Sequence, residues 1–211
     1  MDAALGEMLS LVPVPRAARE ELCARLAEPG RFYHGSGHVS LLWERHRRHG
    51  AGLLFQREPW NTWVACAIAY HDAVYDVTRT DNEALSAELW LRTGADLTPQ
   101  GISWVAGTIL ATACHLAALP EPGMSEEAWA VRLWVLDLDL TPLGEPPDVF
   151  VANTAALRRE QAHLPHEVWE RGRLAFLRGM ALQPRLFRTP VLHDSFEAAA
   201  RANLARELSV C

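Results

Sequence analysis

The sequence contains no lysine, so all of its 20 basic residues are arginines. Together with 26 acidic residues they give a formal net charge of −6 at pH 7. Nucleic-acid polymers and anionic membrane surfaces are bound by clustered positive charge. An acidic chain without a long basic run therefore argues against both as partners.

Cysteine is also scarce. Cys23, Cys66, Cys114 and Cys211 form no Cys-x-x-Cys element and no paired spacing, which argues against a disulfide framework or a structural zinc knuckle. Long apolar runs are missing too, because each one is interrupted well before the roughly 20 residues that span a bilayer. The first residues are acidic and proline-containing, unlike a signal peptide. We expect reduced thiols in a soluble, cytoplasmic protein.

Strand patterns are rare, whereas helix start and stop signals recur along the chain. Pro59 opens an apolar segment, Thr80 with Glu83 forms a capping-box pattern, Thr98 precedes a proline, and Ser125 precedes two glutamates. We expect helices over 59–76, 80–94, 98–117, 125–144, after Pro147, after Pro165, and over 195–208. A chain of 211 residues with 49% apolar content suits one compact domain. The sequence predicts a single all-α bundle over 1–211, with a core at about 31–145 and a C-terminal helical extension at about 147–208.

His71 and Asp72 lie within the apolar stretch from Trp63 to Asp76. Burying two ionisable side chains is costly unless a partner compensates, and a metal ion is the strongest such partner. An ion-paired core dyad is the alternative interpretation.

Three further places carry buried polar residues of the same kind. His34 and His38 lie four residues apart where a helix begins, and His115 lies near the end of another. Asp137 and Asp139 interrupt a third apolar helix. Because residues two apart point roughly 200° apart around a helix, only one of these carboxylates should reach a shared site.

Histidine and aspartate contributed by several helices are typical of a metal site in the core of a bundle. Mixed imidazole and carboxylate ligands suit Mn, Fe, Ni, Co or Zn. Taken alone, an inward-facing histidine such as His38 is more often a hydrogen-bonded core residue. His115 has three interpretations: a metal ligand, a hydrogen-bond donor to a ligand, or a polar residue at a helix end.

Several short motifs of the sequence, taken in order, resemble those of the HD superfamily of metal-dependent phosphohydrolases. They are YHGSGHV, AYHDAVYD, DNEALSAEL, TILATACH, LDLDLTPLG, LRREQAH and FEAAARANLAREL, and they are similar to a bacterial subgroup of predicted phosphohydrolases from about Tyr33 to Leu208. The sequence departs from the family pattern at Gln161, because an aromatic residue is expected there, directly after the Arg-x-Glu motif of Arg158 and Glu160. This departure leaves the role of that segment open.

The resemblance implies an HD-domain-like helical bundle that binds one divalent transition metal ion. It makes His38, His71, Asp72 and Asp139 the ligands, with Asp137 as the competitor for the last position. Dinuclear members resemble a pattern with two further histidines before the final aspartate. Only His115 lies in that interval, so a single metal is favoured and His115 is expected to line the cavity.

The implied activity is hydrolysis of a small phosphate ester, such as a nucleotide, by metal-activated water, as a phosphomonoesterase or phosphodiesterase. Asp76 lies one helical turn beyond Asp72, so it faces the same side and can orient water or protonate the leaving group. Helix termination is its alternative role. His34 can contact substrate or hold a ligand, and Arg31 and Arg79 are candidates for phosphate contact or simply surface charges.

Two other functions remain open at this point. One is a non-catalytic module that binds a nucleotide or another phosphorylated ligand in the same cavity, and the other is a diiron oxygenase, which needs at least one more ligand. The sequence leaves monomer and homodimer equally open. Near the C-terminus, Glu197, Arg201, Asn203 and Glu207 recur at helical spacing, and we interpret them as a structural ion-pair network.

Overall fold

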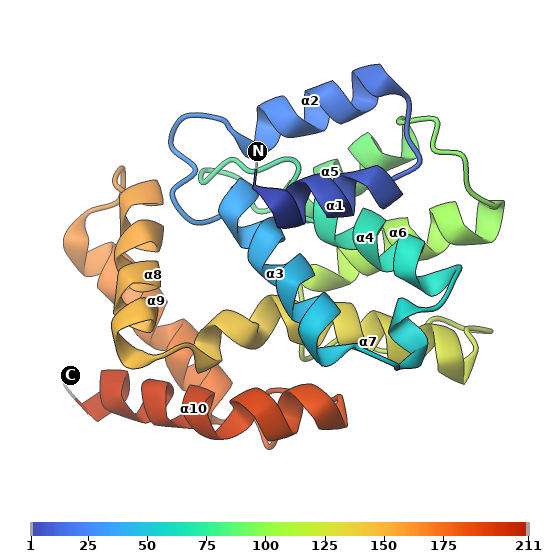
Figure 1. Ribbon diagram of the computed structural model, residues 1–211. Coiled ribbons are helices and arrows are strands. Elements are labelled where there is room, and N and C mark those ends of the chain that lie inside the picture. The colour runs from blue at the N-terminus through green and yellow to red at the C-terminus, as the bar shows by residue number, and fades with distance from the viewer. Residues whose placement is uncertain (1, 210–211) are drawn as a thin grey trace.

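The computed structural model describes residues 2–209, and every regular element within this range is helical (Figure 1). The all-α prediction is confirmed. Cys211 lies outside the described residues. The elements are α1 (Ala3–Leu11), α2 (Arg16–Leu26), α3 (Ser36–His49), η1 (Leu54–Gln56), α4 (Trp60–Tyr70), α5 (Asn82–Leu91), α6 (Pro99–Thr112), α7 (Glu126–Leu140), η2 (Thr141–Gly144), α8 (Pro147–Glu160), α9 (His166–Ala181) and α10 (Pro190–Ser209).

Two helices begin where their capping residues predict. The hydroxyl of Thr98 accepts the N–H of Gly101 at the start of α6, and the hydroxyl of Ser125 accepts the N–H of Ala128 at the start of α7. Each side chain satisfies an N–H group that has no partner inside the helix. The capping box at Thr80 is wrong, because α5 follows Asp81, whose side chain makes no capping hydrogen bond.

Helix α4 is shorter than predicted and ends at Tyr70 instead of Asp76. The guanidinium of Arg31 binds the carbonyl oxygens of Asp72 and Ala73, and the hydroxyl of Ser86 accepts the N–H of Val74. These contacts replace the hydrogen bonds that would continue the helix. His71 therefore caps the C-terminus of α4, and Asp72 lies in the turn that follows.

Helix α4 forms the centre of the core, and α1, α3, α6 and α7 pack around it. All its residues except Asn61 and Thr62 are buried. Trp60 and Trp63 meet Trp104 of α6 with ring centroids 5.8 Å apart in each case. Removing such large apolar side chains from water is the main stabilising contribution, about 1.5–3 kcal/mol for each fully buried one. This packing holds the end of α4 in place.

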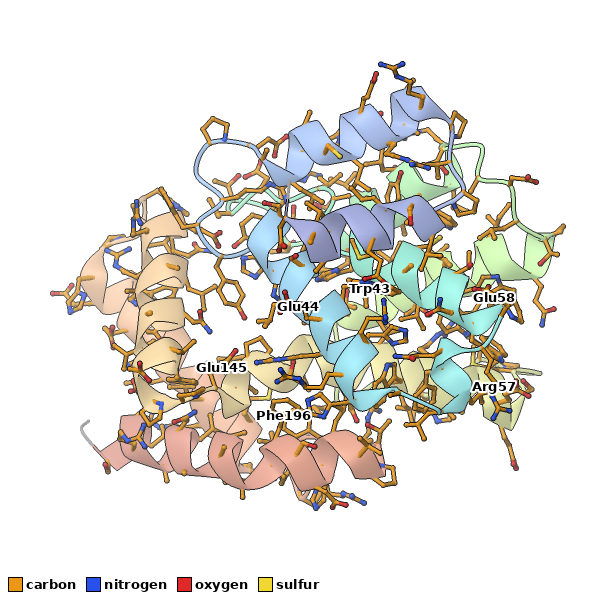
Figure 2. All side chains as sticks on the ribbon, in the orientation of Figure 1. Trp43, Glu44, Arg57, Glu58, Glu145 and Phe196 are labelled. Atoms are coloured by element: carbon orange, nitrogen blue, oxygen red, sulfur yellow. The ribbon has the colours of Figure 1, made fainter. Side chains whose placement is uncertain are left out.

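Helices α8, α9 and α10 stand beside this core (Figure 1), where α8 packs on η2 and α10 packs on both η2 and α9. Arg45 of α3 joins the two parts, because its guanidinium forms an ion pair with Glu145 and lies 4.9 Å from the ring centroid of Phe196. Figure 2 shows Glu145 and Phe196 at this junction. Helix α10 begins at Pro190, earlier than the predicted start at 195.

The polar residues of α10 make separate structural contacts instead of one ion-pair network. Glu197 pairs with Arg201 at 2.8 Å, while Glu207 pairs with Arg173 of α9 at 2.6 Å. Asn203 is uncharged and donates to the carbonyl oxygens of Leu143 and Glu145. These contacts attach α10 to α9 and to η2.

Across residues 2–209, no helix combines the length and the apolar character that crossing a membrane requires.

Candidate metal centre

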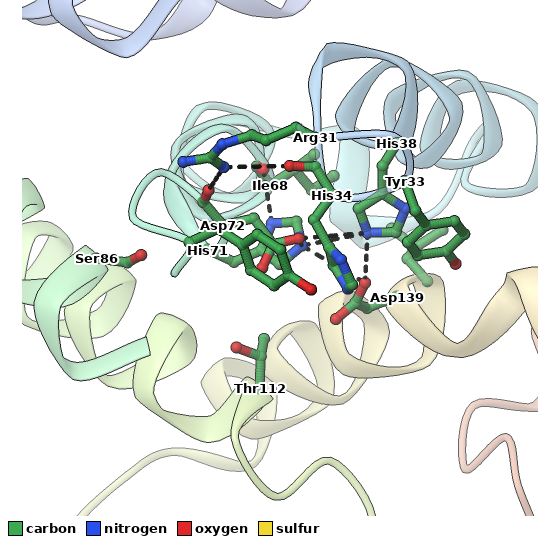
Figure 3. Close-up of polar contacts among 12 residues, drawn as sticks. Arg31, Tyr33, His34, His38, Ile68, His71, Asp72, Ser86, Thr112 and Asp139 are labelled. Carbon is green, nitrogen blue, oxygen red and sulfur yellow. Dashed lines mark hydrogen bonds and ion pairs between the residues drawn. The ribbon is translucent and has the colours of Figure 1, made fainter. Parts of the chain in front are cut away.

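Three segments bring four polar side chains together at one end of the core (Figure 3). His38 comes from the first turn of α3, His71 and Asp72 from the turn after α4, and Asp139 from the last turn of α7. In Figure 3 their side chains point toward one another. The early end of α4 is what lets the adjacent His71 and Asp72 both face the same point.

The facing atoms of these residues lie close together. Nε2 of His38 is 2.8 Å from Oδ1 of Asp139 and 3.3 Å from Nε2 of His71. Nε2 of His71 is 3.5 Å from Oδ1 of Asp139 and 3.1 Å from Oδ2 of Asp72. Oδ2 of Asp72 is 3.9 Å from Nε2 of His38. The ligand atoms of His38, His71 and Asp139 all lie within 4.8 Å of one another.

The separations among His38, His71 and Asp139, 2.8–3.5 Å, are close to those around a bound transition metal ion, whereas Asp72 lies outside the group whose ligand atoms are all within 4.8 Å of one another. Bonds of about 2.1 Å place neighbouring ligand atoms roughly 3.0–3.4 Å apart in octahedral or tetrahedral sites. Oδ2 of Asp72 is buried and has no hydrogen-bond partner among the described residues. An ion would satisfy this oxygen, and two imidazoles with two carboxylates are a suitable donor set for Mn, Fe, Co, Ni or Zn.

The orientation of His71 also suits a ligand. Its Nδ1 is 2.9 Å from the carbonyl oxygen of Ile68, which can only accept a hydrogen bond. Nδ1 therefore carries a proton, and in the neutral ring Nε2 presents its lone pair to the centre. A backbone carbonyl that fixes the tautomer in this way is a common feature of metal-binding histidines.

The charges of the cluster stabilise one another. Burial lowers the pKa of His71, but the carboxylates of Asp72 and Asp139 raise it well above its usual value overall. Burial in turn raises the pKa of Asp139, whereas the charge of His71 and hydrogen bonds from His115 and His38 bring it well below its usual value. The carboxylates are therefore held in the ionised form that a metal ion requires, and the same charges favour the protonated ring of His71, whose Nε2 proton an incoming metal ion would have to displace.

Asp139, and not Asp137, reaches this centre. Asp137 points to the other side of α7, where its Oδ2 accepts the backbone N–H and the hydroxyl of Thr189 at 2.6 and 2.7 Å. Thr189 immediately precedes α10. Burial raises the pKa of Asp137. Asp139 thus faces His38, His71 and Asp72, and Asp137 contacts the start of α10, as the helical angle between them requires.

His115 and His34 flank the cluster. Nε2 of His115 lies 2.6 Å from Oδ2 of Asp139, the oxygen that does not face His38. Nδ1 of His34 lies 2.7 Å from Oε2 of Glu160. Burial lowers the pKa of His34, but the hydrogen bond and charge of Glu160 raise it above its usual value overall.

Glu160, at the end of α8, is the main residue of the site to which sequence reasoning assigned no role. Its Oε1 accepts the backbone N–H groups of Tyr33 and His34, and its Oε2 accepts the hydroxyl of Tyr75. The ring of His34 stacks on Tyr75 with centroids 4.2 Å apart. The Arg-x-Glu motif drew attention to Glu160, but it did not predict that this residue contacts a loop 126 residues away.

Three predicted residues lie elsewhere. Asp76 is not one helical turn beyond Asp72, because α4 ends at Tyr70, and its exposed carboxylate accepts the N–H and hydroxyl of Thr78. Arg31 is buried and its guanidinium binds three backbone carbonyls, those of His34, Asp72 and Ala73. Arg79 is exposed and pairs with Asp81. None of the three lines the cavity described next.

A cavity of about 430 Å³ opens beside the cluster. His34, His38, His71, Asp72, His115 and Asp139 line one side of it. Side chains of α8 and α9 form the opposite side. Its size is typical of sites that bind small molecules.

No protein-family model matches this chain, and comparison with curated proteins and with solved structures likewise finds no significant similarity.

Proposed function

We propose that this protein is a metal-dependent phosphohydrolase that hydrolyses a small phosphate ester. The observation that carries the proposal is the convergence of His38, His71, Asp72 and Asp139 from three segments, in which the Nε2 atoms of the two histidines lie 2.8–3.9 Å from each other and from the facing carboxylate oxygens. They line a cavity large enough for a small molecule. The resemblance of the ordered sequence words to the HD superfamily supports the same activity.

A divalent ion bound by these four residues would polarise a phosphoryl oxygen and lower the pKa of a bound water. The chain's own residues supply orientation and protons. His115 fixes the carboxylate plane of Asp139 through its second oxygen. Because Nδ1 of His34 is held by Glu160, its Nε2 is the ring nitrogen available to the substrate, and its raised pKa suits donation of a proton to the leaving group.

Substitution of the two aspartates of α7 tests the proposal with a matched control. We expect the purified wild type and Asp137→Asn to bind about one metal ion per chain and Asp139→Asn to bind almost none, as measured by elemental analysis. With Mn, Co or Ni added, wild type should release phosphate from a phosphomonoester, a phosphodiester or a nucleotide. Asp139→Asn should be at least about 100-fold slower, because it loses a direct ligand.

Other outcomes would replace the proposal. If wild type binds no metal and Asp139→Asn behaves like Asp137→Asn, the site assignment is wrong. Metal binding without turnover of any phosphate ester would favour a non-catalytic module that binds a phosphorylated ligand. Iron well above one per chain together with oxygen consumption would favour an oxygenase.

A further inference from the structure

The side of the cavity opposite the His/Asp cluster is mostly apolar and includes three aromatic rings, beside the polar Asn153, Thr154 and Arg173. Its apolar part is formed by Phe150 and Leu157 of α8 and by Trp169, Phe176, Leu177 and Met180 of α9. These side chains face the cluster across the same cavity. A molecule with one end at the cluster therefore has its other end against this apolar wall.

The wall is not fully covered by the rest of the protein. Helix α9 fully buries only Leu177, and the side chain of Phe176 remains 50% exposed. When an apolar ligand displaces the water beside large apolar side chains, the free energy of the complex falls. The apolar wall thus favours an apolar group on the ligand.

The cavity offers little positive charge for additional phosphates. Apart from His34 and the other histidines beside the cluster, Arg173 is the one basic residue among the described residues that line the cavity. Its guanidinium already pairs with Glu170 at 3.1 Å and with Glu207 at 2.6 Å. Glu83 adds a negative charge to the lining. A diphosphate or triphosphate chain usually needs several free cationic donors, so this lining fits a single phosphoryl group placed at the metal cluster.

We propose that the substrate is the monophosphate ester of a bulky apolar alcohol, whose alkyl or aryl group lies against the wall formed by α8 and α9. This inference rests on the proposed function and specifies its substrate class. In the reaction, the oxygen of water bonds to phosphorus and the bond from phosphorus to the alcohol oxygen breaks. One water proton passes to that oxygen, giving the free alcohol and inorganic phosphate.

A homologous series of substrates tests the inference. We expect kcat/KM for methyl, butyl, hexyl and octyl phosphate, with Mn added, to rise about three- to fourfold for each added methylene until the cavity is filled. Octyl and 1-naphthyl phosphate should be better substrates than AMP and ATP. A flat series, or faster hydrolysis of ATP or AMP than of octyl phosphate, would overturn the inference and leave the proposed phosphohydrolase activity in place.

Two variants, one within α9 and one directly after it, test whether the dependence of kcat/KM on alkyl length arises at the apolar wall. Phe176→Ala removes a wall residue and should reduce the ratio of the octyl to the methyl kcat/KM by about 10-fold. Leu182→Ala removes an apolar side chain that is 83% exposed and does not line the cavity, so it should leave the ratio unchanged. Circular dichroism checks that both variants are folded. An equal ratio in all three proteins would contradict the assignment of the wall.

Calorimetric titration with alkylphosphonates, which are not hydrolysed, separates this inference from the proposed function. Affinity that rises with alkyl length, together with a negative heat-capacity change, supports the apolar wall even if no ester is turned over. Affinity independent of length contradicts it. A homodimer that Phe176→Arg dissociates, combined with length-independent affinity, would show that a second copy of the chain covers the wall instead.

Discussion

Glu160 links the C-terminal helices to the candidate metal centre through one residue, His34. Its carboxylate accepts hydrogen bonds from the ring of His34, from two backbone N–H groups and from Tyr75. The side chain is fully buried, so each of these bonds forms away from competing water. His34 is consequently held in one orientation at the rim of the cavity.

Replacing Glu160 with Gln should lower the pKa of His34 towards its usual value, because the neighbouring negative charge is lost. We also expect a loss of about 1–3 kcal/mol in the free energy of unfolding. NMR titration of the His34 ring and urea unfolding measure the two effects. Glu167→Gln, at an exposed position of α9, is the control and should change neither.

The pH dependence of this loss has a definite sign. Burial raises the pKa of Glu160, but the hydrogen bond and the charge of His34 bring it below its ordinary 4.5 overall. The contribution of Glu160 to the free energy of unfolding is therefore present above pH 4.5 and is lost as the pH falls through the lowered pKa. The pKa of His34 is raised above 6.5, so its contribution is complete below pH 6.5 and is lost as the pH rises through the raised value. The difference between wild type and Glu160→Gln should be largest between about pH 4.5 and 6.5. A difference independent of pH would contradict the ion pair.

Single residues of the centre differ in how far sequence could predict them. His71 and Asp72 were detectable because they interrupt an apolar segment. The helical angle left Asp137 and Asp139 as alternatives and the family resemblance favoured Asp139, whereas the physical reason for the division, the contact of Asp137 with Thr189 before α10, needed the structure. The Arg-x-Glu motif marked Glu160 but did not show what it contacts, because its partner His34 is 126 residues away.

The turn after α4 determines whether His71 and Asp72 can face the same point. Arg31 holds this turn, since its side chain is only 3% exposed and it donates to the carbonyl oxygens of Asp72 and Ala73. A third bond to the carbonyl of His34 joins the same guanidinium to the loop before α3. One arginine thus aligns two of the segments that carry candidate ligands.

We expect Arg31→Ala to lower the free energy of unfolding by about 2–4 kcal/mol, because it leaves three carbonyls without their donor. It should also weaken metal binding by roughly 10- to 100-fold through displacement of Asp72. Arg79→Ala is the control and should have no measurable effect, since Arg79 is exposed and pairs only with Asp81. Urea unfolding and metal titration provide the comparison. Unchanged metal affinity in Arg31→Ala would show that the turn after α4 keeps its conformation without the hydrogen bonds of Arg31.

Two helix starts with a local capping residue were predictable and the one at Thr80 was not, whereas the end of α4 depends on distant contacts. Thr98 and Ser125 cap their helices through residues three positions ahead, a distance that sequence displays directly. The end of α4 depends on Arg31, which is 41 residues from Asp72. For this reason the apolar pattern to Asp76 predicted a helix that the tertiary contacts interrupt.

The candidate ligands come from three segments that are distant in the chain, at α3, after α4 and at the end of α7. An ion bound by all of them can be held only when the core is folded. Its binding free energy therefore adds to the stability of the whole molecule.

Metal addition should raise the melting temperature of the wild type. At a free metal concentration of 100 times Kd the gain is about 2.7 kcal/mol, which corresponds to roughly 5–10 °C for a protein of this size. Differential scanning calorimetry with and without Mn measures the shift, and a chelator should reverse it. Asp139→Asn should show almost none of it. An equal shift in both proteins would place the bound ion elsewhere.

The last two turns of α7 carry functional contacts on two different sides of the helix, and this restricts insertions and deletions at that end of α7. Asp139 points to the metal cluster, while Asp137 holds the start of α10, which packs on the wall helix α9. Deleting Leu138 would rotate the following residue by about 100° and move it back by about 1.5 Å. Both attachments would then lose their angular relation. Insertions should therefore be tolerated at the exposed positions 119–120, ahead of Glu121, which pairs with the buried Arg132, but not at the end of α7.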